Sequence, residues 1–486
     1  MPSEIEYRLP RTVIPSHYEL TLTPDLDDAS FAGLVVADVA VVEPVSEIVL
    51  NTAELTLHDV ALSNSAGQRL EATVDTDEEA ERSTLRLDGT AIAGAWQLEI
   101  SFDGVLNDDL RGFYRSVYTD PNGVEKTIAT TQFEATEARR AFPCWDEPDL
   151  KATYGVTLIV DDGLMAISNG AEAERTALEG GKVAVRFVDT IKMSTYLVAF
   201  IVGELEVTDP VDVDGIPLRI VYPPGKGNLT SFALDAAAHS LRYYAQYYDI
   251  PYPGGKMDKI AIPDFAWGAM ENMGAVTYRE MALLVDPGKA TQAEMMRVAE
   301  IIAHEIAHMW FGDLVTMKWW NGIWLNEAFA TFASMKCVDA YRPDWKIWLD
   351  FSADRVHSME TDALAATRPI EIAVASPEEA NAMFDSLTYE KGASVLRMLE
   401  QYLGEEAFRR GVSNYLKDNA YGNTDGDDLW LALSEASGEP VKEIMETWIF
   451  QGGFPLVRVD GEPGDYTLTQ QQFRYLGEGD RRWKLP

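Results

Sequence analysis

The chain has 486 residues, too many for one ordinary domain, so about three domains are expected. Its hydrophobic content of 47% is that of a globular protein and argues against a disordered chain. A net charge of −39, with a pI near 4.4, argues against a basic face, so neither nucleic acid nor an anionic membrane is an expected partner.

The sequence shows no sign of export or of membrane insertion. No apolar run reaches the roughly 18 residues that a membrane span needs, and the first ten residues, MPSEIEYRLP, lack the apolar stretch of a secretory signal. The two cysteines, Cys144 and Cys337, are too few for a disulfide framework and are expected to be buried free thiols. We therefore expect a soluble, cytoplasmic protein.

Residues 1–205 have the pattern of a large antiparallel β domain. Segments in which apolar and polar residues alternate are separated by Gly, Asp and Asn, and they occupy 17–26, 46–62, 83–89, 96–104, 154–163 and 182–189.

Residues 206–452 change to helical spacing. Apolar residues recur every three or four positions in five segments, 232–248, 292–312, 324–342, 386–404 and 427–438. Gly404 follows the fourth segment, where a glycine commonly ends a helix. We expect a mainly helical domain here. Residues 453–486 return to strand-like segments around the turn-rich GEPGD, but about 35 residues are too few for an independent β domain.

The segment IIAHEIAHMWFG carries two of the six histidines, His304 and His308, with Glu305 between them. Positions i and i+4 lie on one face of a helix, so both imidazoles can bind one metal ion. Catalytic zinc takes three protein ligands and leaves a position for water, which Glu305 can reach without binding the metal. The alternative is a helix with two surface histidines, and a third ligand decides between them.

Glu327 is the candidate third ligand. It lies 19 residues after His308 in the next predicted helix, within WLNEAFA. A loop containing MKWWNG separates the two helices, so they can pack antiparallel and bring Glu327 to the metal.

Several segments resemble one family. HExxH followed by glutamate at this spacing is similar to the gluzincin metallopeptidases, and GAMEN at 268–272 narrows the resemblance to the aminopeptidase N family, which includes the leukotriene-epoxide hydrolase. Further matching segments are GFYRS at 112–116, TQFEATEARRAFPCWDEP at 131–148, MSTYLVAFIVGE at 193–204, FDSLTYEKGASVLRML at 384–399 and WIFQGGFPLV at 448–457. The resemblance covers essentially the whole chain.

The resemblance implies a multidomain α+β fold. It implies a saddle-like, antiparallel N-terminal β domain over 1–205, a thermolysin-like, mainly α catalytic domain over 206–452, and the start of a C-terminal β-sandwich over 453–486. Family members usually continue with the rest of the sandwich and a large helical domain. We therefore expect the chain to be a truncated member that lacks both.

The resemblance also implies a zinc-dependent aminopeptidase that hydrolyses the N-terminal peptide bond. One Zn²⁺ per chain is expected on His304, His308 and Glu327. Glu305 is the implied general base, and Tyr389 of TYEKG is the implied hydrogen-bond donor to the oxyanion.

The expected substrates are peptides with a free N-terminus. Glu271 of GAMEN and Glu134 of TQFEAT, with Gln132 beside it, are implied to bind the α-ammonium group. The GAMEN segment is implied to pair with the substrate backbone, and its remaining candidate binding residues are Gly268, Ala269, Met270 and Asn272.

Two alternatives to this activity are an epoxide hydrolase with the same site and an inactive binding protein. GAMEN, with alanine instead of a double glycine, disfavours the first, and the intact set of catalytic residues disfavours the second. Four residues near the motifs differ from those common in the family, namely Met273, Met309, Gly322 and Ala328. Gly322 stands where many members carry aspartate, so an acceptor for a zinc-binding histidine must come from elsewhere or be absent.

Overall fold

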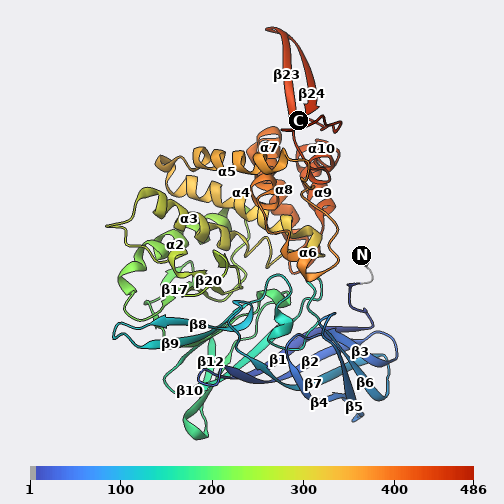
Figure 1. The fold of residues 1–486 in the computed structure, drawn as a ribbon, viewed down its shortest axis with the longest axis vertical. Coiled ribbons are helices and arrows are strands. Elements are labelled where there is room, and N and C mark those ends of the chain that lie inside the picture. Colours follow the sequence, from blue (N-terminus) through green and yellow to red (C-terminus); the bar gives the residue numbers. More distant parts are fainter. Residues whose placement is uncertain (1–6) are drawn as a thin grey trace. The chain divides into compact units, whose positions relative to one another are not determined.

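The structure is a computed structural model that describes residues 7–486 (Figure 1). The expectation about a secretory signal concerns in part residues 1–6, which lie outside the described residues. The chain forms two compact units. We call residues 7–242 and 252–305 the N-terminal unit, and residues 243–251 and 306–486 the C-terminal unit. The expected domain boundaries near 205 and 452 stay a prediction.

The N-terminal unit begins with a ten-stranded sheet, whose alternating sequence places residues such as Tyr18, Leu20 and Leu22 in the core. In spatial order its strands are β12 (Glu172–Ala177), β13 (Lys182–Phe187), β10 (Thr153–Asp161), β1 (Val13–Asp25), β2 (Ser30–Val41), β7 (Gly94–Val105), β4 (Thr56–Ser63), β5 (Arg69–Asp77), β6 (Arg82–Ala91) and β3 (Val45–Asn51). Neighbouring strands are antiparallel except β1 and β10, which pair in parallel from His17 with Thr153. The predicted N-terminal β fold is confirmed, with this parallel pairing as a refinement.

A second sheet of the N-terminal unit has four strands. Their spatial order is β11 (Met165–Ser168), β14 (Phe200–Gly203), β9 (Glu125–Gln132) and β8 (Gly112–Thr119). The last residues of β9 are buried, and the chain that follows them carries Glu134.

The region after residue 206 is mainly helical, as predicted, but it also contains a third sheet whose strands were not predicted. Its spatial order is β15 (Glu206–Val207), β17 (Ile216–Tyr222), β18 (Met257–Ile262), β20 (Ala275–Arg279) and β19 (Ala269–Met270), and β16 (Val211–Val213) pairs with β17. Strands β17, β18 and β20 are parallel to one another. All six residues of β18 are buried, so this strand has no alternation of buried and exposed positions that the sequence could reveal.

The remaining elements are mainly helical. Two helices contain residues of both units, namely α2 (Ser231–Tyr248) and α3 (Gln292–Ala307). The C-terminal unit holds α4 (Ile323–Tyr341), α5 (Ile347–Asp362), α6 (Pro377–Asn381), a π-helix (Leu387–Lys391), α7 (Gly392–Leu403), α8 (Glu405–Asp418), α9 (Gly426–Ser437) and α10 (Val441–Ile449). Two short strands of this unit pair in parallel, β21 (Thr316–Met317) and β22 (Asn423–Thr424).

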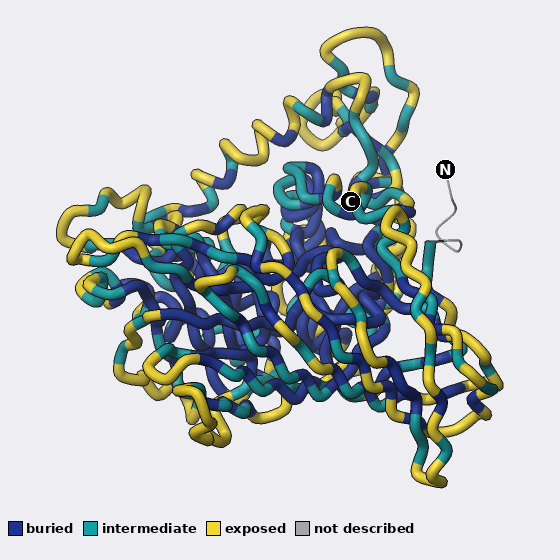
Figure 2. Tube along the Cα trace, turned by 60° about the horizontal axis from the view of Figure 1, so that its bottom comes forward, coloured by how far each residue is buried: buried dark blue, intermediate teal, exposed yellow. Residues whose placement is uncertain are grey.

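Helix α4 has no separate polar face and most of its residues are buried, so it is a central helix of its unit. Figure 2 shows buried segments in the interior and exposed ones along turns and outer edges. Gly404 adopts φ 83° at the end of α7, which confirms it as a helix stop. Helices α5, α6, α8 and α10 were not among the predicted segments.

The C-terminal residues form one hairpin of β23 (Pro455–Glu462) and β24 (Asp465–Gln472), as the strand-like sequence predicts. Cys144 and Cys337 are buried free thiols, also as predicted. Within residues 7–486, no helix combines the length and the apolar character that a membrane crossing requires.

Candidate metal centre

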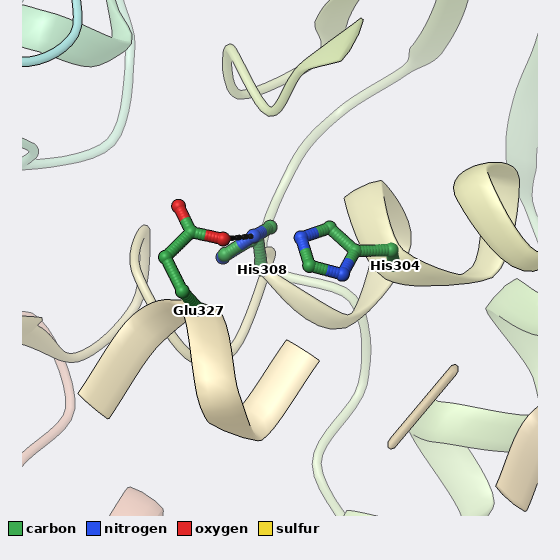
Figure 3. Close-up of side chains that lie close together, drawn as sticks. All are labelled: His304, His308 and Glu327. Carbon is green, nitrogen blue, oxygen red and sulfur yellow. Dashed lines mark ion pairs between the residues drawn. The ribbon is translucent and has the colours of Figure 1, made fainter. Parts of the chain in front are cut away.

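The two histidines and the glutamate predicted as ligands come together. His304 lies in α3, His308 is the first residue after that helix, and Glu327 lies in the first turns of α4. Their candidate ligand atoms all lie within 4.8 Å of one another (Figure 3). Nε2 of His308 is 3.5 Å from a carboxylate oxygen of Glu327.

These three side chains have the donor set of a catalytic zinc site, two imidazoles and one carboxylate. His308 and Glu327 are only 1% and 2% exposed, and a buried carboxylate needs a nearby positive charge, which a metal ion held by the three side chains would supply. The 3.5 Å between Nε2 of His308 and the Glu327 oxygen matches two donors that each lie about 2.0–2.2 Å from one tetrahedral ion. The triad therefore fits a zinc ion.

The turn after α3 fixes the orientation of His308. Nδ1 of His308 lies 2.9 Å from the carbonyl oxygen of Phe311. A carbonyl oxygen only accepts, so Nδ1 carries the proton and Nε2 keeps its lone pair for a metal. The Phe311 ring in turn stacks on Phe329 of α4, with ring centroids 3.9 Å apart. This stack joins the His308 turn to the helix that carries Glu327.

Gly322 does not leave His308 without an acceptor, because the Phe311 carbonyl supplies one. A Cβ atom at Gly322 would lie 2.9 Å from Cβ of Met317, so a larger residue there requires a shift of the chain. The glycine is therefore explained by close packing at the start of α4.

Glu305, the predicted general base, is 6% exposed and lies in α3. Two buried residues of the N-terminal unit that the sequence analysis did not identify interact with its charge, Lys259 of β18 and Tyr278 of β20. Nζ of Lys259 donates a hydrogen bond of 2.8 Å to the Tyr278 hydroxyl. Burial lowers the pKa of Lys259 to about 7, and the charge of Glu305 acts in the opposite direction. Neither β18 nor β20 was among the predicted strands, so no pattern in the sequence marked these two residues.

The two predicted ammonium anchors lie side by side in the N-terminal unit. Carboxylate oxygens of Glu134 and Glu271 are within 4.8 Å of each other. Both residues are buried, 9% and 3% exposed. Gln132 lies at the end of β9, and its Nε2 atom donates to Sδ of Met270 at 3.4 Å. Oε1 of Gln132 is buried and has no hydrogen-bond partner among the described residues.

The GAMEN segment lies at the edge of the third sheet. Ala269 pairs with Tyr278 and Met270 with Thr277, and β19 is the last strand in the order of that sheet. An edge strand leaves one row of backbone groups for another extended chain. A Cβ atom at Gly268 would meet nothing within 4 Å, so the space beside it is open. Asn272 donates a hydrogen bond to Oγ1 of Thr277 at 3.2 Å.

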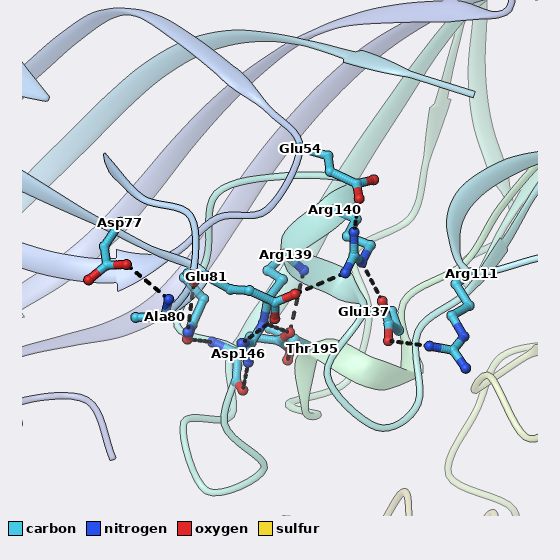
Figure 4. A network of polar contacts seen from close by, with 11 residues as sticks. Glu54, Asp77, Ala80, Glu81, Arg111, Glu137, Arg139, Arg140, Asp146 and Thr195 are labelled. Atoms are coloured by element: carbon cyan, nitrogen blue, oxygen red, sulfur yellow. Dashed lines mark hydrogen bonds and ion pairs between the residues drawn. The ribbon is translucent and has the colours of Figure 1, made fainter. Parts of the chain in front are cut away.

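A network of buried charges holds the loop that follows Glu134 (Figure 4). Arg139 donates to Asp146 at 3.0 Å and pairs with Glu81 at 3.1 Å. Arg140 joins the same Glu81 at 2.9 Å and Glu137 at 2.6 Å. Burial by itself would lower the pKa of Arg139, but its negative neighbours, Asp146 first among them, raise it above the ordinary value. The ion pairs of Arg139 and Arg140 thus fix this loop.

Tyr389 lies in the C-terminal unit, at the middle of the π-helix, and is half-buried. A Cβ atom on Gly392, just after the π-helix, would lie 2.5 Å from Cβ of Ala328, the neighbour of Glu327. The turn that carries Tyr389 therefore packs directly on α4.

Two family models match the chain, the Peptidase M1 N-terminal domain over residues 14–197 and the Peptidase family M1 domain over residues 232–448. Similar proteins include Aminopeptidase M1 of Arabidopsis thaliana, 43% identical over 486 residues, which cover 99% of this chain and 55% of that protein. The puromycin-sensitive aminopeptidase of Caenorhabditis elegans is 44% identical, with 99% and 52% covered, and Aminopeptidase 2, mitochondrial, of Saccharomyces cerevisiae is 42% identical, with 97% and 50% covered.

The chain spans about half the length of the curated relatives it matches. The two family models follow one another along it in order, and the zinc-fitting triad lies within the second match. The chain therefore belongs to the peptidase M1 family of metallopeptidases.

Proposed function

We propose that the protein is a zinc-dependent aminopeptidase that removes residues from the free N-terminus of peptides. The observation that carries the proposal is the His304, His308 and Glu327 triad. The membership of the chain in the M1 family and the names of its aminopeptidase relatives support the same activity.

The triad would hold one zinc ion per chain. When bound, the ion supplies Lewis acidity, which polarises a carbonyl group and makes water more acidic. Glu305 takes the proton of the attacking water and then delivers it to the leaving amine. Glu305 is next to His304 on α3, so its side chain leaves the helix at a different angle from the two histidines, which supports a role as base and not as ligand.

Tyr389 would donate a hydrogen bond from its phenol to the oxygen that becomes negatively charged during attack. A fixed donor aimed at this charge stabilises the transition state more than the bound peptide, and it therefore raises kcat.

Glu134 and Glu271 would bind the α-ammonium group of the substrate. An ammonium group has three N–H donors, and two carboxylates plus the unpartnered Oε1 of Gln132 offer three acceptors. The open edge of β19, from Gly268 to Met270, supports pairing with the peptide backbone. This set of acceptors selects peptides with a free N-terminus.

We also infer a cytoplasmic location, and the free thiols of Cys144 and Cys337 support it. The yeast relative carries "mitochondrial" in its name, so organelles are the alternative that imaging of a tagged chain would test.

The function is tested with aminoacyl chromogenic substrates and a pair of peptides that differ only by N-acetylation. We expect hydrolysis of the free peptide and none of the acetylated one, and equal cleavage of both would rule out an aminopeptidase. Glu305→Gln should bind as much zinc as the unsubstituted chain yet lose at least about 100-fold in kcat. Full activity of this variant would reject Glu305 as the general base.

A further inference from the structure

The π-helix that carries Tyr389 is a local departure from α-helical geometry. The backbone N–H of Lys391 donates to the carbonyl of Ser386 at 3.0 Å, five residues back, and that of Glu390 donates to the same oxygen at 3.1 Å. Such single π turns cost some helical stability and are common at functional sites. The turn therefore needs contacts from outside itself to hold its shape.

The first anchor lies at the start of the turn. One carboxylate oxygen of Asp385 accepts hydrogen bonds from the backbone N–H groups of Leu387 at 2.9 Å and Thr388 at 3.1 Å. Arg368 donates to the same oxygen at 2.6 Å and to the Thr388 hydroxyl at 2.9 Å. A charged cap, itself fixed by a guanidinium group, thus holds the first residues of the π-helix.

The second anchor lies at its end. Nζ of Lys391 pairs with a carboxylate oxygen of Asp362 at 2.8 Å, and the two side chains are 8% and 2% exposed. The other oxygen of Asp362 accepts from the backbone N–H of Gly453 at 2.7 Å, and Nζ of Lys391 also donates to the Gly453 carbonyl at 3.2 Å. Three segments far apart in sequence therefore meet at one ion pair.

The buried ion pair of Lys391 and Asp362 is not explained by its contribution to the stability of the fold. Burial lowers the pKa of Lys391, and the charge of Asp362 opposes that shift. Buried ion pairs often contribute no more stability than apolar side chains of the same size, but they require one geometry. Lys391 is the last residue of the π turn, two residues after Tyr389. Its ion pair with Asp362 therefore fixes the geometry in which the turn ends.

We propose that Lys391 and Asp362 are positioning residues that hold the π turn, and with it the Tyr389 phenol, in a single orientation. The proposal rests on the proposed function in one respect, since Tyr389 acts there as the oxyanion donor. The placement of Tyr389 itself does not depend on any catalytic step.

The same unit contains a matched control. Lys336 of α4 pairs with Glu400 of α7 at 2.6 Å, and these side chains are 10% and 1% exposed. Lys336→Met removes the ion pairs of another largely buried lysine, with Glu400 and with Glu405, outside the π turn. It therefore controls for a general loss of stability.

The first test reports on Tyr389 directly. 3-Fluorotyrosine is incorporated at position 389 of the 486-residue chain, and its ¹⁹F resonance is recorded. We expect Lys391→Met to move or broaden this resonance and Lys336→Met to leave it in place. If Lys391→Met does not fold, Asp362→Asn replaces it in this test. Asp362→Asn keeps an acceptor for Gly453 and should also move the resonance. A resonance that coincides with that of the unsubstituted chain in every folded variant of the pair overturns the proposal.

The second test is a kinetic cycle with Tyr389→Phe. We expect Lys391→Met to lower kcat roughly 10-fold or more with little change in KM, and to have almost no further effect in the Tyr389→Phe background, because residues that act through one group are not additive. An equal loss in both backgrounds overturns the proposal. A chain without any peptidase activity refutes the proposed function instead, and the ¹⁹F resonance then decides about Lys391 and Asp362 alone.

Discussion

Gly392 and Ala328 pack so closely that a Cβ atom on Gly392 would lie 2.5 Å from Cβ of Ala328. Ala328 directly follows the zinc-ligand candidate Glu327, and Gly392 directly follows the π-helix of Tyr389. At this contact, the turn that carries the proposed oxyanion donor meets the helix that carries a candidate metal ligand.

Gly392→Ala should therefore destabilise the chain and lower kcat. A methyl group inserted at this point overpacks the contact, for which a loss of about 1–3 kcal/mol in the free energy of unfolding is typical. Urea unfolding and kcat with an aminoacyl substrate measure the two effects. Adding Ala328→Gly removes the clashing atom, since the next atom of Ala328 would lie 3.7 Å away. If this double variant recovers neither quantity, the contact is not the cause.

Removal of the metal should abolish activity and lower the melting temperature. A ligand that binds only the folded chain contributes about 2.7 kcal/mol at 100 times its Kd, and chelation removes that contribution. Activity should return when zinc is added back, measured with the same aminoacyl substrate. His308→Ala should not recover, whereas His357→Ala, at a side chain 78% exposed, should behave like the unsubstituted chain. Zinc-dependent recovery of His308→Ala would contradict the ligand assignment.

Glu271→Gln and Glu134→Gln should weaken binding of the substrate's ammonium group. Each change removes one charge-assisted hydrogen bond, so we expect kcat/KM for free peptides to fall about 10- to 100-fold. The loss should appear mainly in KM. Glu172→Gln, on the exposed strand β12, provides the control and should leave both constants unchanged. Unaltered KM in both site variants would remove these residues from the ammonium site.

The buried Lys259 should make stability depend on pH. Its pKa is about 7 in the folded chain, because of burial, against about 10.4 when unfolded. Below pH 7 the lysine is charged in both states, so the folded chain bears the cost of the buried charge. Between these values the unfolded chain holds more protons, so the free energy of unfolding rises with pH, by at most about 1.4 kcal/mol per unit.

Lys259→Met should thus stabilise the chain most at low pH, and its advantage should shrink as the pH rises from about 7 to about 10. Urea unfolding at three pH values measures the difference. Lys192→Met, at an exposed residue, should show no such trend. An advantage of Lys259→Met that stays constant with pH would show that the lysine keeps its proton when buried.

Arg139→Met should cause a large loss of stability, because it leaves the carboxylate of Asp146 buried without its cationic partner. Breaking a buried pair in this way typically costs about 3–5 kcal/mol. Urea unfolding measures it. Arg69→Met, which breaks the exposed pair with Glu71, should give no measurable change. A similar effect of the two variants would mean that the network of Figure 4 contributes little.

Much of the fold and of the candidate site could be predicted from local sequence. His304, Glu305 and His308 follow from the spacing of one helix, and the strands of the large sheet follow from alternation. Helix α3 nevertheless ends at Ala307, earlier than predicted, because His308 belongs to a turn held by Phe311. The buried strand β18 was missed because neither of its faces is exposed.

The candidate metal ligands and the family could be predicted from local sequence alone, because a helix repeats every 3.6 residues and short motifs keep their spacing. Only the tertiary structure brought Lys391, Asp362 and Gly453 to one point and placed Lys259 near the charge of Glu305. Those contacts join residues up to 91 positions apart. They exist only once whole sheets and helices have packed, so no local pattern of residues encodes them.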